Sequence, residues 1–136
     1  MKIILDTNVI VSAILSPAGK PSHIVALVLG GKIKLLYDNR ILAEYITVLK
    51  REKFKLNKEL CDFIIEYIIR EGEFLNASSL TTDFHHKDDK KFYELYKSGG
   101  ADYLVTGNIK HFPKERGIVS PATFVEREMA KQQMSK

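Results

Sequence analysis

Apolar and polar residues follow one another along the chain in blocks that predict strands and helices in turn. Short continuous apolar runs predict strands at 2–5, 32–37, 73–76, 102–107 and 117–120. Apolar residues at helical spacing predict helices at 8–15, 23–31, 39–51, 57–72, 89–98 and from 121 onward. Continuous apolar strands that alternate with helices are typical of a parallel sheet covered on both faces. The pattern therefore predicts an α/β fold.

Polar residues mark where several of these helices should begin. Asp38 and Asn57 each precede an apolar helical stripe and are good N-caps, and Ser22 can cap the helix that Gly30 and Gly31 end. Asp102, at the start of a strand, is expected to form a hydrogen bond with the backbone.

No repeat or linker interrupts the chain, so we expect a single domain over residues 1–130, followed by a polar tail at 131–136.

Composition narrows the class of protein. The chain has 136 residues, 45% hydrophobic and 28% charged, which suits one globular domain with its own core. The single cysteine, Cys61, rules out an internal disulfide and is expected in the core. The apolar runs are too short for a signal peptide or a membrane span, so we expect a soluble, cytoplasmic protein. The net charge of +4 favours polyanionic partners but does not require them.

Polar residues gather at one predicted edge of the sheet. Asp6 ends the first strand, Thr106 and Asn108 follow the fourth, and Asp89 begins the helix before that strand. Glu44 lies at the rim of its helix's apolar stripe, not opposite it. Ligands of open α/β sheets bind beyond the carboxyl ends of the strands. We therefore expect these side chains to meet there.

Carboxylates brought together repel one another unless a cation lies between them. A small number of oxygen donors suits Mg²⁺ or Mn²⁺, which keep several waters and also bind substrate phosphate. Such an ion activates water and offsets charge on a phosphodiester under attack. The acids, in a chain with a positive net charge, are consistent with metal-dependent cleavage of a nucleic acid.

The same residues resemble those of the PIN domain family, compact nucleases common as toxins of bacterial toxin–antitoxin pairs. "ILDTNVIVSAIL" resembles the opening strand with the first acid, Asp6, and "ILAEYITVLKREKF" resembles the second motif, with Glu44. "DDKKFYELY" resembles the third motif, and alignment on Phe92 selects Asp89 over Asp88. "GADYLVTGN" resembles the segment that leads to the fourth position.

The resemblance implies a three-layer α/β/α fold with a roughly five-stranded parallel sheet. It implies a divalent-metal-dependent endoribonuclease, with Asp6, Glu44 and Asp89 as catalytic residues and metal ligands and Asn108 as a fourth ligand. Thr7, Asn8, Ser12 and Thr106 would support them. A small antitoxin would be the usual partner, and a homodimer would be common.

The chain departs from the family pattern at two places. The fourth position is usually an acid, and Asn108 offers a carbonyl oxygen without a charge. The segment before Asp89 often starts with Asp-Pro, whereas here it reads "HHKD". A second hypothesis follows from Asn108: a PIN-like module that binds RNA or a protein and cuts nothing. A phosphatase of the haloacid dehalogenase type also starts with a strand ending in Asp, but it needs a second Asp where this chain has Asn8.

Each candidate also has a simpler structural interpretation. The side chain of Asp6 could cap the helix that follows, through the amides near Val9, and Asp89 could be an N-cap. Thr7 and Asn8 could only fix the turn by hydrogen bonds. Ser12 could point to the same edge or be buried and bonded to its own helix.

The sequence leaves open the roles of two further groups of residues, a basic stretch and the histidines. The stretch "LKREKFKLNK" places Lys50, Arg51, Lys53 and Lys55 around Phe54, which fits either an RNA phosphate track or a solvated helix end. His85 and His86 lack the helical spacing of a zinc pair, and no cysteine lies near them, so the sequence does not favour zinc there. His23 and His111 look isolated and receive no assigned chemistry.

Overall fold

The computed structural model, which describes residues 1–134, contains a five-stranded, all-parallel sheet. Its order is β3-β2-β1-β4-β5. The strands are β1 (Lys2–Leu5), β2 (Lys34–Tyr37), β3 (Glu73–Phe74), β4 (Tyr103–Val105) and β5 (Ile118–Val119). All five lie within the segments predicted from their apolar runs, and the three-layer α/β/α expectation is confirmed.

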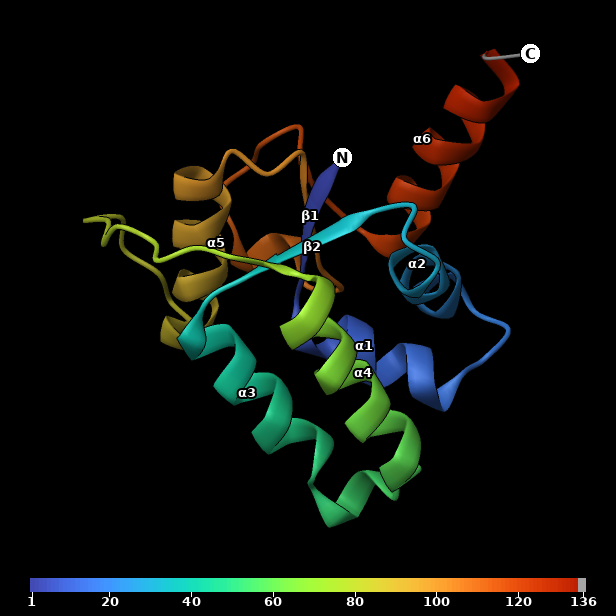
Figure 1. Cartoon of the computed structure of the whole chain (residues 1–136). Coiled ribbons are helices and arrows are strands. Elements are labelled where there is room, and N and C mark those ends of the chain that lie inside the picture. The colour runs from blue at the N-terminus through green and yellow to red at the C-terminus, as the bar shows by residue number, and fades with distance from the viewer. Residues whose placement is uncertain (135–136) are drawn as a thin grey trace.

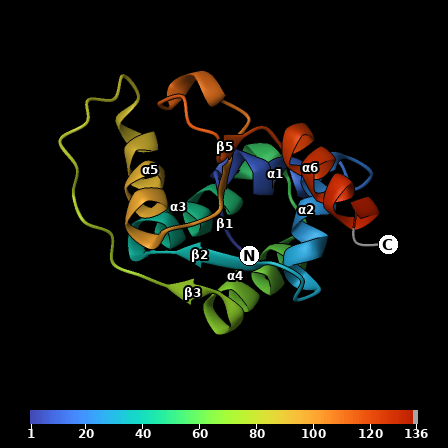
Figure 2. The same cartoon turned by 90° about the horizontal axis from the view of Figure 1, so that it is seen from above.

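Six helices surround the sheet within the described residues. They are α1 (Thr7–Leu15), α2 (Lys20–Leu29), α3 (Asn39–Leu49), α4 (Lys58–Glu71), α5 (Lys87–Gly99) and α6 (Pro121–Met134). Short 3-10 turns, η1 (Glu52–Phe54) and η2 (Ile109–His111), complete the described elements. Figure 2 shows α5 on one face of the sheet and α2 and α6 on the other.

The central strand, β1, sets the register that positions the polar edge. Leu5 pairs with Val105, and all of Ile3, Ile4 and Leu5 are buried. The next residue on each strand is polar, so Asp6 and Thr106 follow their strands at the same level. At the other end of β1, the backbone N–H of Lys2 donates to Asp102 at 2.9 Å, as expected for this acid.

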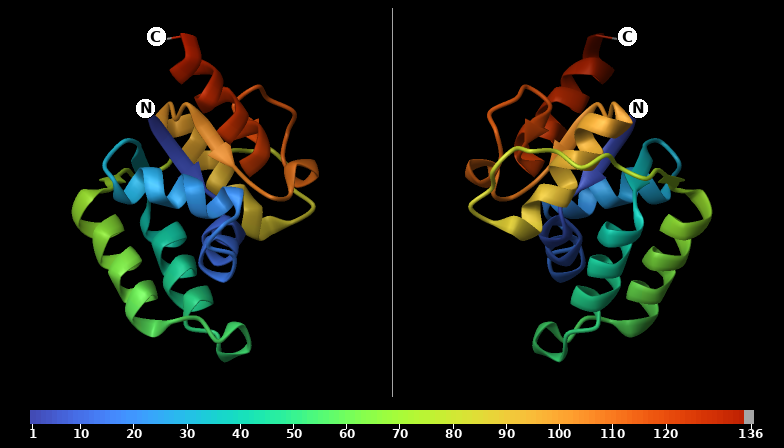
Figure 3. Two further views of the ribbon diagram at one scale, coloured as in Figure 1. Left: turned by 90° about the vertical axis from the view of Figure 1, so that its right-hand side faces the viewer. Right: turned by 90° about the vertical axis from the view of Figure 1, so that its left-hand side faces the viewer.

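Helices α3 and α4 pack against each other as a hairpin that projects from the sheet (Figures 1 and 3). Asp38 caps α3 by accepting from the N–H of Ile41 at 2.9 Å, and Asn57 caps α4 by accepting from the N–H of Leu60 at 3.0 Å. Cys61 is buried and belongs to the hydrophobic core. These three sequence predictions are confirmed.

Several boundaries differ from those predicted. Helix α2 begins at Lys20 with Gly19 as N-cap, so Ser22 is not the cap. Pro21 lies in the first turn. There its fixed φ favours the helix, and its missing N–H costs nothing because the first amides of a helix have no partner within it. Gly31 has a φ of +75°, and β2 begins only at Lys34. Helix α6 continues to Met134, so 131–134 are helical, and 135–136 of the expected tail lie outside the described residues.

Helices α1 and α2 are joined at a bend of 103°. Within residues 1–134, no single helix is long and apolar enough to cross a membrane, although this bent pair together has the length and composition. Its apolar residues Val9, Ile10 and Ile24 are buried in the core of the fold.

Candidate active site

Asp6 is a buried carboxylate at the carboxyl end of β1, with only 4% of its surface exposed. Its backbone N–H donates to the carbonyl of Val105 at 2.9 Å, which extends the β1–β4 ladder by one residue. The hydroxyl of Thr106 then donates to Oδ2 of Asp6 at 2.7 Å. Asp6 occupies the N-cap position of α1, but its side chain makes no capping hydrogen bond, so the cap interpretation is wrong.

Two other candidate acids act electrostatically on Asp6. Burial raises the pKa of Asp6 above its ordinary value, the hydrogen bond from Thr106 lowers it, and the charges of Asp89 and Glu44 raise it further. Glu44 and Asp89 therefore lie close enough to Asp6 at this edge for their charges to raise its pKa.

Glu44 reaches this edge from the middle of α3. The buried hydroxyl of Tyr45 donates to the carbonyl of Leu5, which fixes α3 against the end of β1. The hydroxyl of Thr7 donates to one oxygen of Glu44, and Nζ of Lys91 lies 2.7 Å from the other. Glu44 is thus turned toward protein groups and not toward bulk solvent.

Asp89 lies in the first turn of α5, because the helix begins at Lys87, two residues earlier than predicted. His86 occupies the N-cap position, so the interpretation of Asp89 as an N-cap is wrong. Oδ2 of Asp89 instead lies 2.9 Å from Nδ1 of His111. Asp88, its neighbour, is exposed.

Two histidines join Asp89 in a cluster that the sequence analysis did not predict. The rings of His86 and His111 stack with centroids 3.8 Å apart and planes 17° apart. Within residues 1–134, these two histidines and Asp89 form the group of three whose potential ligand atoms all lie within 4.8 Å of one another. His111 is therefore not isolated. Its position three residues after Asn108, at the carboxyl edge of the sheet, was the available signal.

The supporting residues divide into two groups. Thr7 and Thr106 are buried and bond to Glu44 and Asp6, respectively. Asn8 and Ser12 are exposed, and neither side chain makes a hydrogen bond in the described part of the chain. Asn8 therefore does not fix the turn in that way, and the interpretation of Ser12 as a buried serine bonded to its own helix is wrong.

Asn108 is half-buried and acts here through its backbone. Its N–H donates to the hydroxyl of Thr106 at 3.0 Å, and its carbonyl accepts from the N–H of His111 at 2.9 Å. A continuous chain of hydrogen bonds therefore runs from Asp6 through Thr106 and Asn108 to His111, and from there to Asp89.

An ion network holds α3 to α5 beside the acids. The guanidinium of Arg40 lies 2.8 Å from Asp38 and 2.7 Å from Glu94, and both acids are buried. Oε2 of Glu94 also accepts from the N–H of Leu80 at 2.8 Å. Burial favours a raised pKa for Glu94, but the hydrogen bonds from Arg40 and Leu80 outweigh it and hold the pKa below its ordinary value. Because Glu44 and Asp89 lie on these two helices, the network helps to fix the distance between them.

The predicted RNA-binding residues lie at the far end of α3. All four are exposed: Lys50, Arg51, Lys53 and Lys55. Three of them line a hollow of about 840 Å³ between the end of α3 and the start of α4. At about 1.5 Å per residue, Lys50 lies about 9 Å farther along the helix axis than Glu44. Phe54 is half-buried against the core, so it is not a fully exposed stacking ring.

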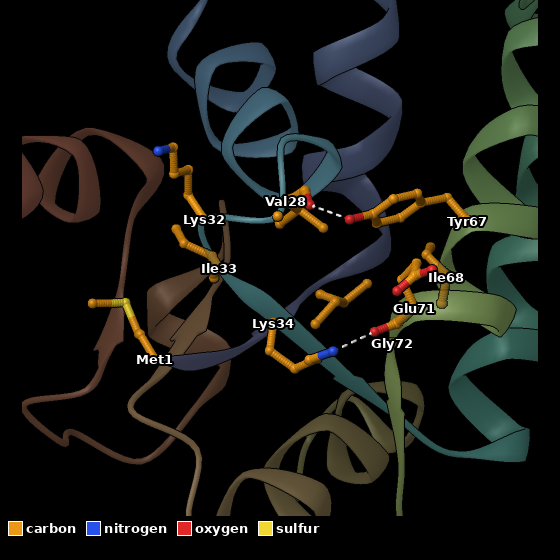
Figure 4. Close-up of a pocket in the computed structure, with 11 residues that line it drawn as sticks. Met1, Val28, Lys32, Ile33, Lys34, Tyr67, Ile68, Glu71 and Gly72 are labelled. Carbon is orange, nitrogen blue, oxygen red and sulfur yellow. Dashed lines mark hydrogen bonds between the residues drawn. The ribbon is translucent and has the colours of Figure 1, made fainter.

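A second hollow, of about 290 Å³, lies at the opposite end of the strands (Figure 4). Met1, Ile33 and Lys34 line it, and they stand before or at the start of β1 and β2. Its walls are joined by hydrogen bonds from Tyr67 to the carbonyl of Val28 and from Lys34 to that of Glu71. It is therefore separate from the acidic edge.

A comparison with known protein families assigns the chain to a family. The family model for the PIN domain matches residues 2–110, most of the chain. The chain belongs to the PIN domain family. PIN domains are generally nucleases, and they typically use divalent metals. No curated protein and no solved structure matches the chain.

The PIN match covers Asp6, Glu44, Asp89 and Asn108 but ends one residue before His111. The three acids and Asn108 thus belong to the segment that defines the PIN domain. The imidazole that contacts Asp89 comes from outside that segment, and it is a feature of this chain that the family match does not describe.

Proposed function

We propose that this PIN domain is a divalent-metal-dependent endoribonuclease and the toxin of a toxin–antitoxin pair. Its substrate would be RNA, its partner a small antitoxin protein, its assembly a homodimer and its location the cytoplasm. The family match supports a nuclease, and the acids at the carboxyl edge of the sheet support the metal-dependent class.

The burial of Asp6 beside two other acids is the observation that carries the proposal. A buried carboxylate is unfavourable unless it is paired, and Glu44 and Asp89 add like charge in place of a counter-ion. Thr106 supplies one hydrogen bond, but an ionised carboxylate has acceptor capacity for several more partners. A divalent cation bound at this edge would offset the cost of burying the charge of Asp6 and would reduce the repulsion between the three carboxylates.

The donor set fits an ion that prefers oxygen. Asp6, Glu44 and Asp89 would hold Mg²⁺ or Mn²⁺, and the carbonyl of the Asn108 side chain would add a neutral fourth oxygen. When bound, the ion would lower the pKa of a water that attacks the phosphodiester and would offset the charge that develops on phosphate.

The chain's own residues orient this set. The hydroxyl of Thr106 fixes one oxygen of Asp6, and the hydroxyl of Thr7 fixes one oxygen of Glu44. Ligands held by such outer hydrogen bonds keep their orientation, which usually contributes about 10–100-fold to metal affinity or activity. The exposed cations at the end of α3 would contact the backbone phosphates of the RNA.

A non-cleaving module that binds RNA or a protein is the second candidate. Two observations favour it: the fourth position carries no charge, and Lys91 already neutralises Glu44. Both would weaken the attraction for a divalent ion.

RNA decay with Mn²⁺, with and without a chelator, tests the proposal. Wild type and Asp88→Asn should cleave RNA, whereas Asp6→Asn and Asp89→Asn should lose most activity. Asp88 is a matched control because it neighbours Asp89 on the same helix turn and is exposed. Asn108→Asp should increase cleavage by restoring a fourth charge. Absence of chelator-sensitive cleavage in both wild type and Asn108→Asp would favour the binding module.

A further inference from the structure

Three donor groups of the metal-binding type converge beside the acidic edge from two separate elements. His86 precedes α5, Asp89 lies in its first turn, and His111 ends η2. Their potential ligand atoms lie within 4.8 Å of one another. Two ligands of one zinc ion, each about 2.0–2.1 Å from the metal, are separated by at most about 4.2 Å. The spacing of the three donors therefore approaches that of ligands around one zinc ion.

The chemistry of these donors selects a class of metal. Imidazole nitrogen suits Zn²⁺, Ni²⁺ and related transition ions, whereas Mg²⁺ prefers oxygen ligands and water. Two imidazoles and one carboxylate are a ligand set found in catalytic zinc sites, which keep a fourth position open for water or substrate.

We propose that His86, Asp89 and His111 form a binding site for a transition-metal ion of the zinc class. The site is distinct in its donors from the all-oxygen set of Asp6, Glu44 and Asp89, with which it shares one carboxylate. It goes beyond the proposed cleavage because it needs neither RNA nor Mg²⁺.

Part of the site is already fixed. Nδ1 of His111 lies 2.9 Å from Oδ2 of Asp89, and the backbone of His111 is held by the carbonyl of Asn108. His111 and Asp89 are both partly buried, whereas His86 is exposed at the end of a long irregular connection. The site therefore has two positioned ligands and a third that can move.

The stacking of the two rings predicts one movement on binding. An imidazole nitrogen binds a metal in the plane of its own ring, and two nearly parallel rings 3.8 Å apart cannot both point at one ion. His86 must turn out of the stack to bind. The N-terminus of α5 disfavours a cation, but Asp88 and Asp89 in its first turn oppose that effect.

Calorimetric titration with Zn²⁺ of the chain without any histidine tag tests the site. Wild type should bind one Zn²⁺ that excess Mg²⁺ does not displace. His86→Ala and His111→Ala should each weaken binding at least about tenfold, the lower limit usual for losing even an outer-shell partner. His85→Ala is the matched control, since His85 is the exposed neighbour of His86 outside the cluster, and it should bind like wild type.

Nuclear magnetic resonance gives a second readout that does not depend on substitutions. On addition of Zn²⁺, the ring signals of His86 and His111 should shift, while those of His23 and His85 should not. Failure of wild type to bind Zn²⁺, or equal binding by the His86, His111 and His85 variants, would overturn the inference.

Asp6→Asn separates this inference from the proposed nuclease. The variant should lose RNA cleavage and keep Zn²⁺ binding, because Asp6 is not in the histidine cluster. Loss of Zn²⁺ binding in Asp6→Asn, with binding retained in His86→Ala, would place zinc among the carboxylates and refute the site. Zinc binding without cleavage by wild type would support the site and count against the nuclease.

Discussion

Thr106 donates its hydroxyl hydrogen to Asp6 at 2.7 Å, across one hundred positions of sequence. Both residues are buried, and the same hydroxyl accepts from the N–H of Asn108. One side chain therefore fixes both the carboxylate of Asp6 and the turn that leads to His111.

Replacing Thr106 with Val should destabilise the fold by about 1–3 kcal/mol. The change keeps the shape but removes one hydrogen bond from the buried carboxylate of Asp6 and one from the N–H of the half-buried Asn108. Chemical denaturation measures the loss. Thr106→Ser keeps the hydroxyl and should recover most of it; equal destabilisation by both variants would attribute the effect to packing.

Lys91 should limit the affinity of the acidic edge for divalent metal. Its ammonium lies 2.7 Å from Glu44, so a metal ion must bind beside a positive charge. Lys91→Met keeps the apolar stem and should tighten Mn²⁺ binding at least about fivefold, since one nearby unit charge in a partly buried site is worth at least about 1 kcal/mol.

Lys97→Met provides the control for Lys91. It removes the same charge from the same helix, but Lys97 pairs with Glu115, 3.0 Å away. Titration with Mn²⁺ measures the affinity of both variants. Similar Mn²⁺ affinities for Lys91→Met and Lys97→Met would show that the ion pair between Lys91 and Glu44 does not affect metal binding.

Glu94 should make the fold sensitive to acid. Because hydrogen bonds lower its pKa in the folded state, the unfolded state binds its proton first as the pH falls. Its contribution to stability is therefore full above pH of about 4.5, the ordinary pKa of a glutamate, and is lost as the pH falls through the lower folded value.

The variant Glu94→Gln tests this pH dependence. At neutral pH it should be about 1.5–3 kcal/mol less stable than wild type, the usual worth of a hydrogen bond to a charged group. The difference should shrink below pH of about 4.5, as measured by unfolding at a series of pH values. Glu66→Gln, an exposed acid on α4, should follow wild type throughout. A difference independent of pH would exclude the charge of Glu94 as its cause.

The exposed cations at the end of α3 should determine the salt dependence of RNA binding. The test uses an Asp6→Asn background, which should prevent cleavage. There, Arg51→Ala with Lys55→Ala should lower the affinity for RNA. The slope of log K against log salt should fall by about 1.4, because each phosphate contact on a single strand contributes about 0.7. Lys20→Ala with Lys32→Ala removes two exposed cations from outside this hollow and serves as the control. Equal slopes for the two pairs would favour a solvated helix end.

Local chemistry explains which elements could be predicted. Asp38 and Asn57 cap their helices as expected, because an N-cap depends only on a side chain and the amides three residues later. The prediction fails at Ser22, where Pro21 already starts the helix, and at Asp89, where α5 begins two residues earlier. In both places several residues compete to begin the helix, and a single sequence does not rank them.

The sequence by itself determined the order of strands and helices, the parallel sheet and the position of Asp6 at a strand end, because these follow from the spacing of apolar residues. Only the tertiary structure decided the partners of the acids: Lys91 for Glu44, and His111 for Asp89. These contacts join residues far apart in the chain, and they form where α3, α5 and the turn after β4 pack at one edge of the sheet. Periodicity fixes which face of a helix is buried, but the position of that helix against its neighbours depends on the whole core.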